Sequence, residues 1–386
     1  MPIINRIAEF QDDMTVWRRD LHAHPETAFE EHRTSAFVAE KLESFGIEVH
    51  RGLAGTGIVG TLKTGDGPSI GLRADMDALD VTEHGEHAHK SVFEGKMHAC
   101  GHDGHTTMLL GAARYLAETR NFTGTVHFIF QPAEENEGGG RVMVADGLFE
   151  KFPVDAVYGL HNWPGHEAGV FAVASGPIMA ATNTFQITVK GRGCHGAMPH
   201  LGVDPVPIAA EIVSALQTIS SRRTHPVDSI VVTVTQFHAG DTWNVIPDTA
   251  QLSGTVRAFK PDVLATIEPS LRRIANGICQ AHEAEMELIY NPGYPATIND
   301  EEQTRRAYKA AADVIGEEKV IEDPTPSMGA EDFSFMLNER PGCYVWLGNG
   351  SGEGGCVLHN ARYDFNDEIL SIGASYWSRL VELELG

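Results

Sequence analysis

A dense run of possible metal ligands occurs in the segment Met97-His-Ala-Cys-Gly-His-Asp-Gly-His105. It holds four thiol or imidazole side chains within eight residues, and such side chains bind zinc and related transition metals. Cys100 and His102 stand two positions apart, so in an extended segment both point to the same side. The alternative is a histidine-rich surface loop with a buried thiol. A structural zinc finger is disfavoured, because no second CxxC or HxxxH spacing completes a tetrahedral ligand set.

Three apolar runs, each typical of a buried strand, lead into further polar side chains. They are 69–72 before Asp75 and Asp77, 125–130 before Glu134 and Glu135, and 156–160 before His161. Ligands of open α/β sheets bind outside the carboxyl ends of the strands, so we expect these side chains to meet in one crevice. Each has an alternative when taken alone. Acidic residues at strand ends also cap helices, and a single histidine is often a hydrogen-bonded core residue.

Glu134 and Glu135 are the most informative pair. Two carboxylates stay ionised together at low cost only when cations neutralise them, which favours a metal. Beside a metal, one carboxylate acts as a ligand, and the other accepts a proton from water and passes it to the leaving group. The alternative is an exposed acidic turn before the glycines at 138–140.

Apolar periodicity predicts the elements that position these residues. Apolar side chains recur at three- and four-residue steps through residues 4–21, which predicts a first helix that Pro25 ends. Further helices are predicted through 37–42 and 108–116, and a further buried strand at 57–62. Strands that alternate with helices favour a largely parallel α/β sheet.

A unit with a different pattern begins at residue 184. Its strands and helices are predicted, in order, at 185–190, 205–220, 229–237, 250–257, 261–281 and 286–290. This βαββαβ order is ferredoxin-like. We therefore expect an α/β fold with two domains. The first has a largely parallel central sheet flanked by helices and comprises residues 1–183 and 294–386, ending in a helix at 369–385. The second is the inserted unit, residues 184–293.

Composition excludes several classes of partner. The 386 residues carry 29 Lys+Arg against 53 Asp+Glu, a formal charge of −24, without a basic run. Nucleic acids and anionic membranes both attract basic surfaces, so we expect neither as a partner. The first residues lack the apolar core of a signal peptide, and no apolar stretch is long enough to span a bilayer. Five scattered cysteines do not indicate a disulfide framework. We expect a cytoplasmic protein that acts on small molecules.

Together these segments resemble the M20 metallopeptidase family. The resemblance rests on six motifs in the family's order: 73–79 (RADMDAL), 98–105 (HACGHDGH), 131–135 (QPAEE), 193–197 (GCHGA), 329–332 (GAED) and 358–360 (LHN). It extends from about Trp17 to the C-terminal helix. It is similar in particular to the branch of hippurate hydrolases and N-acyl-amino-acid amidohydrolases, which includes the plant auxin-conjugate hydrolases.

The resemblance implies a site for two divalent metal ions per subunit in the larger domain. The implied ligands are Cys100, His102, Glu135, His161 and His359. It assigns Glu134 as general base and later proton donor, and Asp77 as the carboxylate that orients a ligand. Thiolate and imidazole ligands favour Zn²⁺, whereas the carboxylates leave Mn²⁺ and Co²⁺ open.

The resemblance also implies that the inserted unit is a lid and dimerisation domain, so we expect a homodimer or a homotetramer. It assigns His195 to the oxyanion of the tetrahedral intermediate, and Asn244 and Arg257 to the free carboxylate of the substrate. An arginine binds a carboxylate through two hydrogen bonds, which suits that role. Without the resemblance, Arg257 is an ordinary residue near a strand end and Asn244 a turn residue.

The expected reaction is hydrolysis of an N-acyl amino acid, hippurate-like or N-acetylated, to a carboxylic acid and a free amino acid. The first alternative is a dipeptidase or aminopeptidase on the same metals. That activity needs an acidic group for the substrate ammonium, whereas the lid motifs offer Asn244 and Arg257. A non-catalytic binding protein is disfavoured because the base and all implied ligands are present. A nucleotide-dependent enzyme is disfavoured because no phosphate-binding glycine loop follows the first strand.

Overall fold

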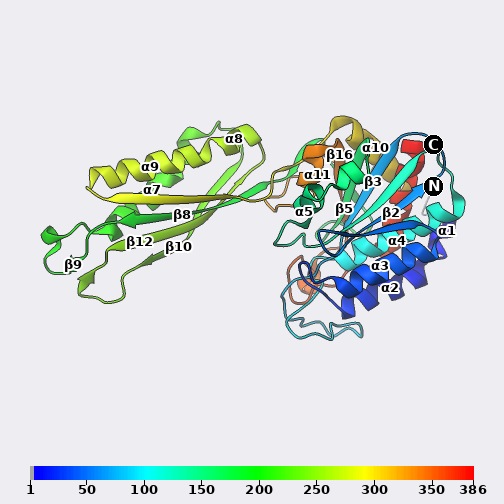
Figure 1. Cartoon of the computed structure of the whole chain (residues 1–386), viewed down its shortest axis with the longest axis horizontal. Coiled ribbons are helices and arrows are strands. Elements are labelled where there is room, and N and C mark those ends of the chain that lie inside the picture. The colour runs from blue at the N-terminus through cyan, green and yellow to red at the C-terminus, as the bar shows by residue number, and fades with distance from the viewer. Residues whose placement is uncertain (1–3) are drawn as a thin grey trace. The chain divides into compact units, whose positions relative to one another are not determined.

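The computed structural model describes residues 4–386 and divides the chain into two compact units. Unit 1 comprises the residues up to Gly176 together with Ile298–Thr325 and Asp332–Gly386, and unit 2 comprises Pro177–Thr297 and Pro326–Glu331. Figure 1 shows the elements of both units. The domain limits given above and the lid role of the inserted unit stay predictions.

An eight-stranded sheet forms the centre of unit 1, with the order β1-β2-β4-β3-β5-β16-β6-β15. Its strands are β1 (Glu48–Leu53), β2 (Gly57–Lys63), β3 (Ser69–Asp75), β4 (Thr125–Gln131), β5 (Ala156–Trp163), β6 (Phe171–Val173), β15 (Val320–Glu322) and β16 (Gly342–Gly348). The neighbours β4–β3, β3–β5, β5–β16 and β6–β15 are parallel. The pairs β1–β2, β2–β4 and β16–β6 are antiparallel. The parallel core of the sheet thus includes all three strands whose ends we expected to carry ligands.

Helices cover both faces of this sheet. They are α2 (Gln11–Ala23), α3 (His32–Ser44), α4 (His102–Thr119), α5 (Gly139–Ala145), α10 (Glu301–Ile315), α11 (Ser334–Glu339) and α12 (Leu370–Leu385). α4 and α12 pack together, with α2 and α3 beside α4 and α10 beside α12. α5 and α11 contact each other on the other face of the sheet (Figure 1). The predicted parallel α/β class with flanking helices is confirmed.

Two short breaks distinguish the observed helices from the predicted ones. The first predicted helix is divided into α1 (Asn5–Ala8) and α2, and α2 ends before Pro25 as expected. Helix 261–281 is divided at Thr266 into α8 (Pro261–Ala265) and α9 (Ile267–Ala281). Apolar periodicity continues across both breaks, so it does not reveal them.

Unit 2 contains a four-stranded antiparallel sheet of order β10-β12-β8-β13. Its elements are β8 (Ala181–Lys190), α7 (Pro205–Thr218), β10 (Ile230–Ala239), β12 (Thr249–Ala258), α9 and β13 (Glu285–Pro292). This is the predicted βαββαβ order. Every second residue along β8 is buried, because α7 and α9 cover one face of the sheet and the other face is more open.

Besides short 3-10 and π turns, the remaining strands and α-helices of the described residues are short. They are α6 (Leu148–Lys151), β7 (Gly176–Met179), β9 (Cys194–His195), β11 (Val245–Ile246) and β14 (Thr297–Asn299). β9 pairs with β11, and β7 pairs with β14. Within residues 4–386, no helix is long and apolar enough to cross a membrane.

Candidate metal centre and active site

The carboxyl ends of β3, β4 and β5 lie at one edge of the unit 1 sheet, because these three neighbours run parallel. Asp75 ends β3, Gln131 ends β4, and His161 lies near the end of β5. The segment that leads into α4 brings Cys100 to the same place, together with His102, the first residue of α4.

Gly101 determines how this segment turns into α4. It adopts φ +95°, which favours glycine. A Cβ atom at this position would overlap the amide nitrogen of Asn162 and the hydroxyl oxygen of Tyr363. Asn162 donates from Nδ2 to the carbonyl oxygen of Cys100 at 2.6 Å. The glycine therefore lets β5 approach the chain closely between the two candidate ligands.

Five side chains assigned as metal ligands from the resemblance lie together in unit 1. They are Cys100, His102, Glu135, His161 and His359. Ligand atoms of Cys100, Glu135 and His359 lie within 4.8 Å of one another. Nε2 of His359 is 3.2 Å from Oε2 of Glu135, and Sγ of Cys100 is 3.4 Å from Nε2 of His161. His102 joins them through Glu135, with 3.7 Å between its Nε2 and Oε1.

Asp77 contacts two of these candidate ligands. Its Oδ1 lies 3.1 Å from Nδ1 of His102, and its Oδ2 accepts the backbone N–H of Glu135 at 3.0 Å. A hydrogen bond at Nδ1 directs Nε2 of His102 toward Glu135. The position of Asp77 therefore suits the orienting role implied for it.

Burial and charge perturb the side chains of this cluster. Burial alone lowers the pKa of His102, but the carboxylates of Asp75, Asp77 and Glu135 raise that pKa to about 10. Burial raises the pKa of the Cys100 thiol, and the charges of Glu135 and Glu134 raise it further. Burial holds the pKa of His161 well below its usual value, and His105 lowers it further. A thiol and carboxylates buried together favour the bound state of a cation.

Two unpaired buried atoms test whether the cluster suits a metal. Nε2 of His102 and Oε1 of Glu135 are both inaccessible to solvent and make no hydrogen bond. Such atoms are costly in a folded protein unless a ligand satisfies them. Together with the thiol and the two other imidazoles, they form a donor set that fits zinc and similar ions. The residues therefore fit the metal ions that the resemblance implies.

His105 and Asp75 belong to the same group of close polar residues but have other partners. Nδ1 of His105 lies 2.6 Å from Oδ1 of Asp75, and its Nε2 accepts the backbone N–H of Asn162 at 2.8 Å. Oδ2 of Asp75 accepts from Arg73 at 2.7 Å. Both ring nitrogens of His105 are therefore engaged, which makes it a positioning residue rather than a metal ligand.

A buried polar network beside Glu134 is the part of the site that sequence reasoning missed. Arg73 donates to Asp332 at 3.0 Å and to Gln131 at 2.8 Å, and Gln131 donates to Asp332 at 2.8 Å. The backbone N–H of Asp332 lies 3.4 Å from Oε1 of Glu134. Arg73 and Asp332 both lie in the motifs of the family resemblance. The signal that could have indicated a buried polar network is the arginine within an otherwise apolar strand.

The other three predicted site residues, His195, Asn244 and Arg257, belong to unit 2. His195 lies in β9 opposite Val245. The backbone carbonyl oxygen of Asn244 accepts the backbone N–H of Gly196 at 2.8 Å. The pairing of β9 with β11 therefore holds His195 and Asn244 near each other. Arg257 lies in β12, where it donates to Thr182 and, at 2.8 Å, to Thr255.

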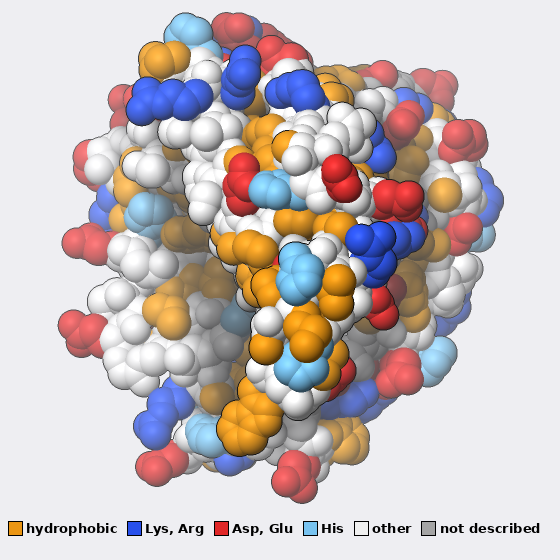
Figure 2. Space-filling view, turned by 90° about the vertical axis from the view of Figure 1, so that its left-hand side faces the viewer, with side chains coloured by type: hydrophobic (Ala, Val, Ile, Leu, Met, Phe, Trp, Pro, Cys, Tyr) orange, Lys and Arg blue, Asp and Glu red, His pale blue; other side chains and the backbone are white. Residues whose placement is uncertain are grey.

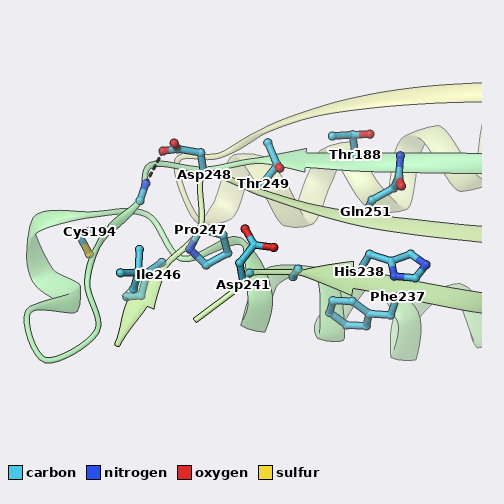
Figure 3. A pocket seen from close by; sticks show the side chains of 14 residues that line it. Thr188, Cys194, Phe237, His238, Asp241, Ile246, Pro247, Asp248, Thr249 and Gln251 are labelled. Atoms are coloured by element: carbon cyan, nitrogen blue, oxygen red, sulfur yellow. Dashed lines mark hydrogen bonds between the residues drawn. The ribbon is translucent and has the colours of Figure 1, made fainter. Parts of the chain in front are cut away.

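Figure 3 shows the surroundings of this strand pair, where Asp248 accepts the backbone N–H of Gly193 at 2.7 Å. Cys194 and Ile246 lie on its two strands. Figure 2 shows that hydrophobic and histidine side chains gather on this end of unit 2. Exposed apolar residues of this region are Met198, Leu201, Phe237, Trp243 and Val245.

The fold and the buried centre define a metal-binding α/β protein with an inserted ferredoxin-like unit. The sequence pattern of the Peptidase family M20/M25/M40 matches residues 71–383, so the chain belongs to this family. The resemblance stated from the motifs is thereby confirmed.

Individual relatives cover nearly the whole chain. It is 41% identical over 381 residues to the hippurate hydrolase of Campylobacter jejuni, covering 98% of both proteins. It is 37% identical over 372 residues to the N-acetylcysteine deacetylase of Bacillus subtilis, covering 95% of this chain and 96% of that protein. The solved structure of the Bacillus subtilis YXEP protein, described as a dinuclear metal-binding peptidase of the M20 family, matches with a TM-score of 0.86 and 35% identity. That match covers 98% of this chain and 99% of the other.

Proposed function

We propose that this protein is a metal-dependent amidohydrolase that cleaves N-acyl amino acids to a carboxylic acid and a free amino acid. Membership of the family and the relatives that hydrolyse N-acyl amino acids support this reaction. The observation that carries the proposal is the convergence of five thiol, imidazole and carboxylate donors beside a further carboxylate, Glu134.

Cys100, His102, Glu135, His161 and His359 would hold two divalent ions. Zn²⁺ is the favoured occupant, with Mn²⁺ and Co²⁺ as alternatives. When bound, such ions supply Lewis acidity that activates water and polarises the amide carbonyl. Asp77 keeps His102 in the tautomer that presents Nε2, because its carboxylate accepts the hydrogen on Nδ1.

Glu134 moves the proton in this proposal. Its carboxylate accepts a proton from the attacking water and later delivers that proton to the leaving nitrogen. It is buried, and one ligand atom of Glu134 lies within 4.8 Å of those of His102 and Glu135. The backbone N–H of Asp332 holds the side chain in place.

The residues of unit 2 take the binding roles. His195 donates a hydrogen bond to the oxyanion as the tetrahedral intermediate forms. Asn244 and Arg257 hold the free carboxylate of the amino acid, so substrates with a C-terminal amide bind less well. Within one chain these two residues lie toward opposite ends of β12, so in this proposal they come from two different subunits. We further propose a homodimer or homotetramer that associates through unit 2, which the exposed Trp243 and Val245 support, and a cytoplasmic location.

The test measures amine release from hippurate and a panel of N-acetyl amino acids. Each substrate is compared with its C-terminal amide, using metal-stripped protein with and without Zn²⁺ or Mn²⁺. We expect metal-dependent release from the free acids and little from the amides. Amine release from dipeptides alone would favour the alternative function, a dipeptidase or aminopeptidase. If the metal-loaded protein releases no amine from any of these substrates, the proposal that it is an amidohydrolase is contradicted.

A further inference from the structure

A second cluster of imidazole and carboxylate groups lies in unit 1 and shares no residue with the centre above. It contains His22 of α2 and two histidines, His87 and His89, from the loop between β3 and α4. The rings of His87 and His89 stack with centroids 4.1 Å apart. The ring of His22 lies 5.3 Å and 5.4 Å from them, edge to face.

Two carboxylates complete the cluster. Oε1 of Glu83 lies 2.6 Å from Nε2 of His87 and 3.4 Å from Nε2 of His22. Asp364, far along the chain, lies 3.1 Å from Nε2 of His89 and 3.7 Å from Nδ1 of His87. One ligand atom from each of His22, His87 and Asp364 falls within 4.8 Å of the other two. This separation suits donors arranged around one ion.

His22 is oriented as metal-binding imidazoles usually are. Its Nδ1 lies 2.8 Å from Oδ2 of Asp103, and both side chains are buried. An ionised carboxylate only accepts, so Nδ1 carries the hydrogen. In the neutral ring, the lone pair is then on Nε2, which faces the cluster. A carboxylate behind a histidine in this way fixes the ring and increases its basicity toward a metal.

The balance of charges around the cluster favours binding of a divalent cation. Four carboxylates surround it: Glu83, Asp103, Asp364 and Asp367. Two guanidinium groups balance part of this charge, Arg18 at 2.8 Å from Asp364 and 2.6 Å from Asp367, and Arg19 at 2.8 Å from Asp367. With neutral imidazoles, two negative charges stay uncompensated, and buried charge is costly without a counterion.

We propose that His22, His87 and Asp364 bind a divalent transition-metal ion in addition to those of the candidate active site. Glu83 is the nearest further oxygen donor, and His89 holds the carboxylate of Asp364. Imidazole and carboxylate ligands favour Zn²⁺. Bound there, the ion joins α2, the loop 76–101 and the segment before α12, and so fixes the loop that leads into Cys100.

The competing state is a proton in the same place. Without a cation, burial lowers the pKa of His22, but the hydrogen bond to Asp103, the charge of Asp103 and the hydrogen bond to Glu83 raise that pKa to about 9. A protonated His22 would then supply positive charge. The experiment therefore has to count metal ions directly rather than measure activity.

Equilibrium dialysis of the metal-stripped full chain against Zn²⁺ at pH 7.5, followed by elemental analysis, tests the proposal. We expect His87→Gln to bind one zinc fewer per chain than the wild type, or to bind it at least about 10-fold more weakly. The matched control is His84→Gln, which removes an exposed histidine of the same loop and should retain the zinc content of the wild type.

A second measurement needs no variant. Zinc added to the wild-type protein should slow amide hydrogen exchange in residues 80–97, and this protection should be absent in His87→Gln. Equal zinc content in His87→Gln and the wild type would overturn the proposal, as would equal losses in the two variants. Unchanged exchange in the zinc-loaded wild type would overturn it as well, whatever the variants do. Both readouts are independent of hippurate hydrolysis.

Discussion

Nδ1 of His105 lies 2.6 Å from Oδ1 of Asp75, and the other ring nitrogen accepts the N–H of Asn162. The ring therefore joins α4 to the ends of β3 and β5. Its position in the HACGHDGH segment does not distinguish it from the candidate ligands Cys100 and His102. The difference lies in its partners, which occupy both ring nitrogens.

Replacing His105 by phenylalanine should destabilise the fold without removing a metal. The change leaves the carboxylate of Asp75 and the N–H of Asn162 short of a partner in a buried site. We expect the metal-stripped variant to lose about 2–5 kcal/mol of unfolding free energy in urea. The folded, reconstituted variant should contain as many metal ions as the wild type. A stable variant lacking one ion would make His105 a ligand instead.

Adjacent residues Glu134 and Glu135 allow a matched comparison. Glu134→Gln should retain its metal ions and lose on the order of 10²–10⁴ in kcat, because an amide does not accept the proton from water. Glu135→Gln should bind metal more weakly, because it removes a charged oxygen that faces His102 and His359. Elemental analysis and hippurate kinetics on both variants check this. Near-normal turnover in Glu134→Gln would contradict its role as the base.

Arg257→Ala should affect substrates with a free carboxylate selectively. Losing a charge-assisted contact costs about 1.5–3 kcal/mol, which corresponds to roughly 10- to 150-fold in kcat/KM. The C-terminal amide of the same substrate should lose much less, because it carries no charge for Arg257 to bind. Arg272→Ala, which removes an exposed arginine of α9 paired with Glu268, is the control. Equal losses on acid and amide would mean that Arg257 acts only through the fold.

His127 should make the stability of unit 1 depend on pH. It is buried in β4, and this burial lowers its pKa to about 4. Below pH 6.5 the unfolded chain binds a proton there and the folded chain does not. The contribution to stability is therefore fully present above pH 6.5 and is lost as the pH falls toward 4, by about 3 kcal/mol.

Urea unfolding of metal-free protein between pH 4 and pH 7.5 measures this effect. Other buried histidines also titrate, so the informative quantity is the difference between the wild type and His127→Gln, which still has a polar group to meet Thr61. We expect the loss of stability toward low pH to be smaller in the variant. Parallel curves for the two proteins would rule out a depressed pKa at His127.

Local pattern predicted much of the fold. Strands β2 to β5 and the order of unit 2 followed from apolar runs and periodicity, because burial on one or both faces imposes those patterns. β1 was missed because most of its residues are exposed. β16 is an entirely buried central strand, yet its run Gly342–Gly348 begins and ends with glycine and lacks a clear period.

The residues of the metal centre could be predicted from the sequence where neighbours in the chain act together. Those contributed by distant segments were harder to predict. Glu134 and Glu135 indicated a metal because two neighbouring carboxylates need a cation. His359 entered only through the family resemblance, since no local pattern reports its 3.2 Å approach to Glu135. The cluster of His22, His87 and Asp364 joins three separate segments, the last of them 277 residues beyond His87, so only the fold reveals it.

Gly101 should be the least replaceable glycine of the centre. Gly101→Ala puts a Cβ against Asn162 and Tyr363 and forces a side chain into the left-handed region at φ +95°. Cys100 and His102 flank it, so relief of this overlap displaces candidate ligands. We expect metal affinity to fall at least about 10-fold.

The control is Gly277→Ala in α9, where nothing lies within 4 Å of the new Cβ. That change should stabilise the fold by about 0.5–1 kcal/mol and leave metal content unchanged. Isothermal titration with Zn²⁺ and urea unfolding on both variants measure the two effects, and wild-type affinity in Gly101→Ala would show that the segment tolerates a different turn.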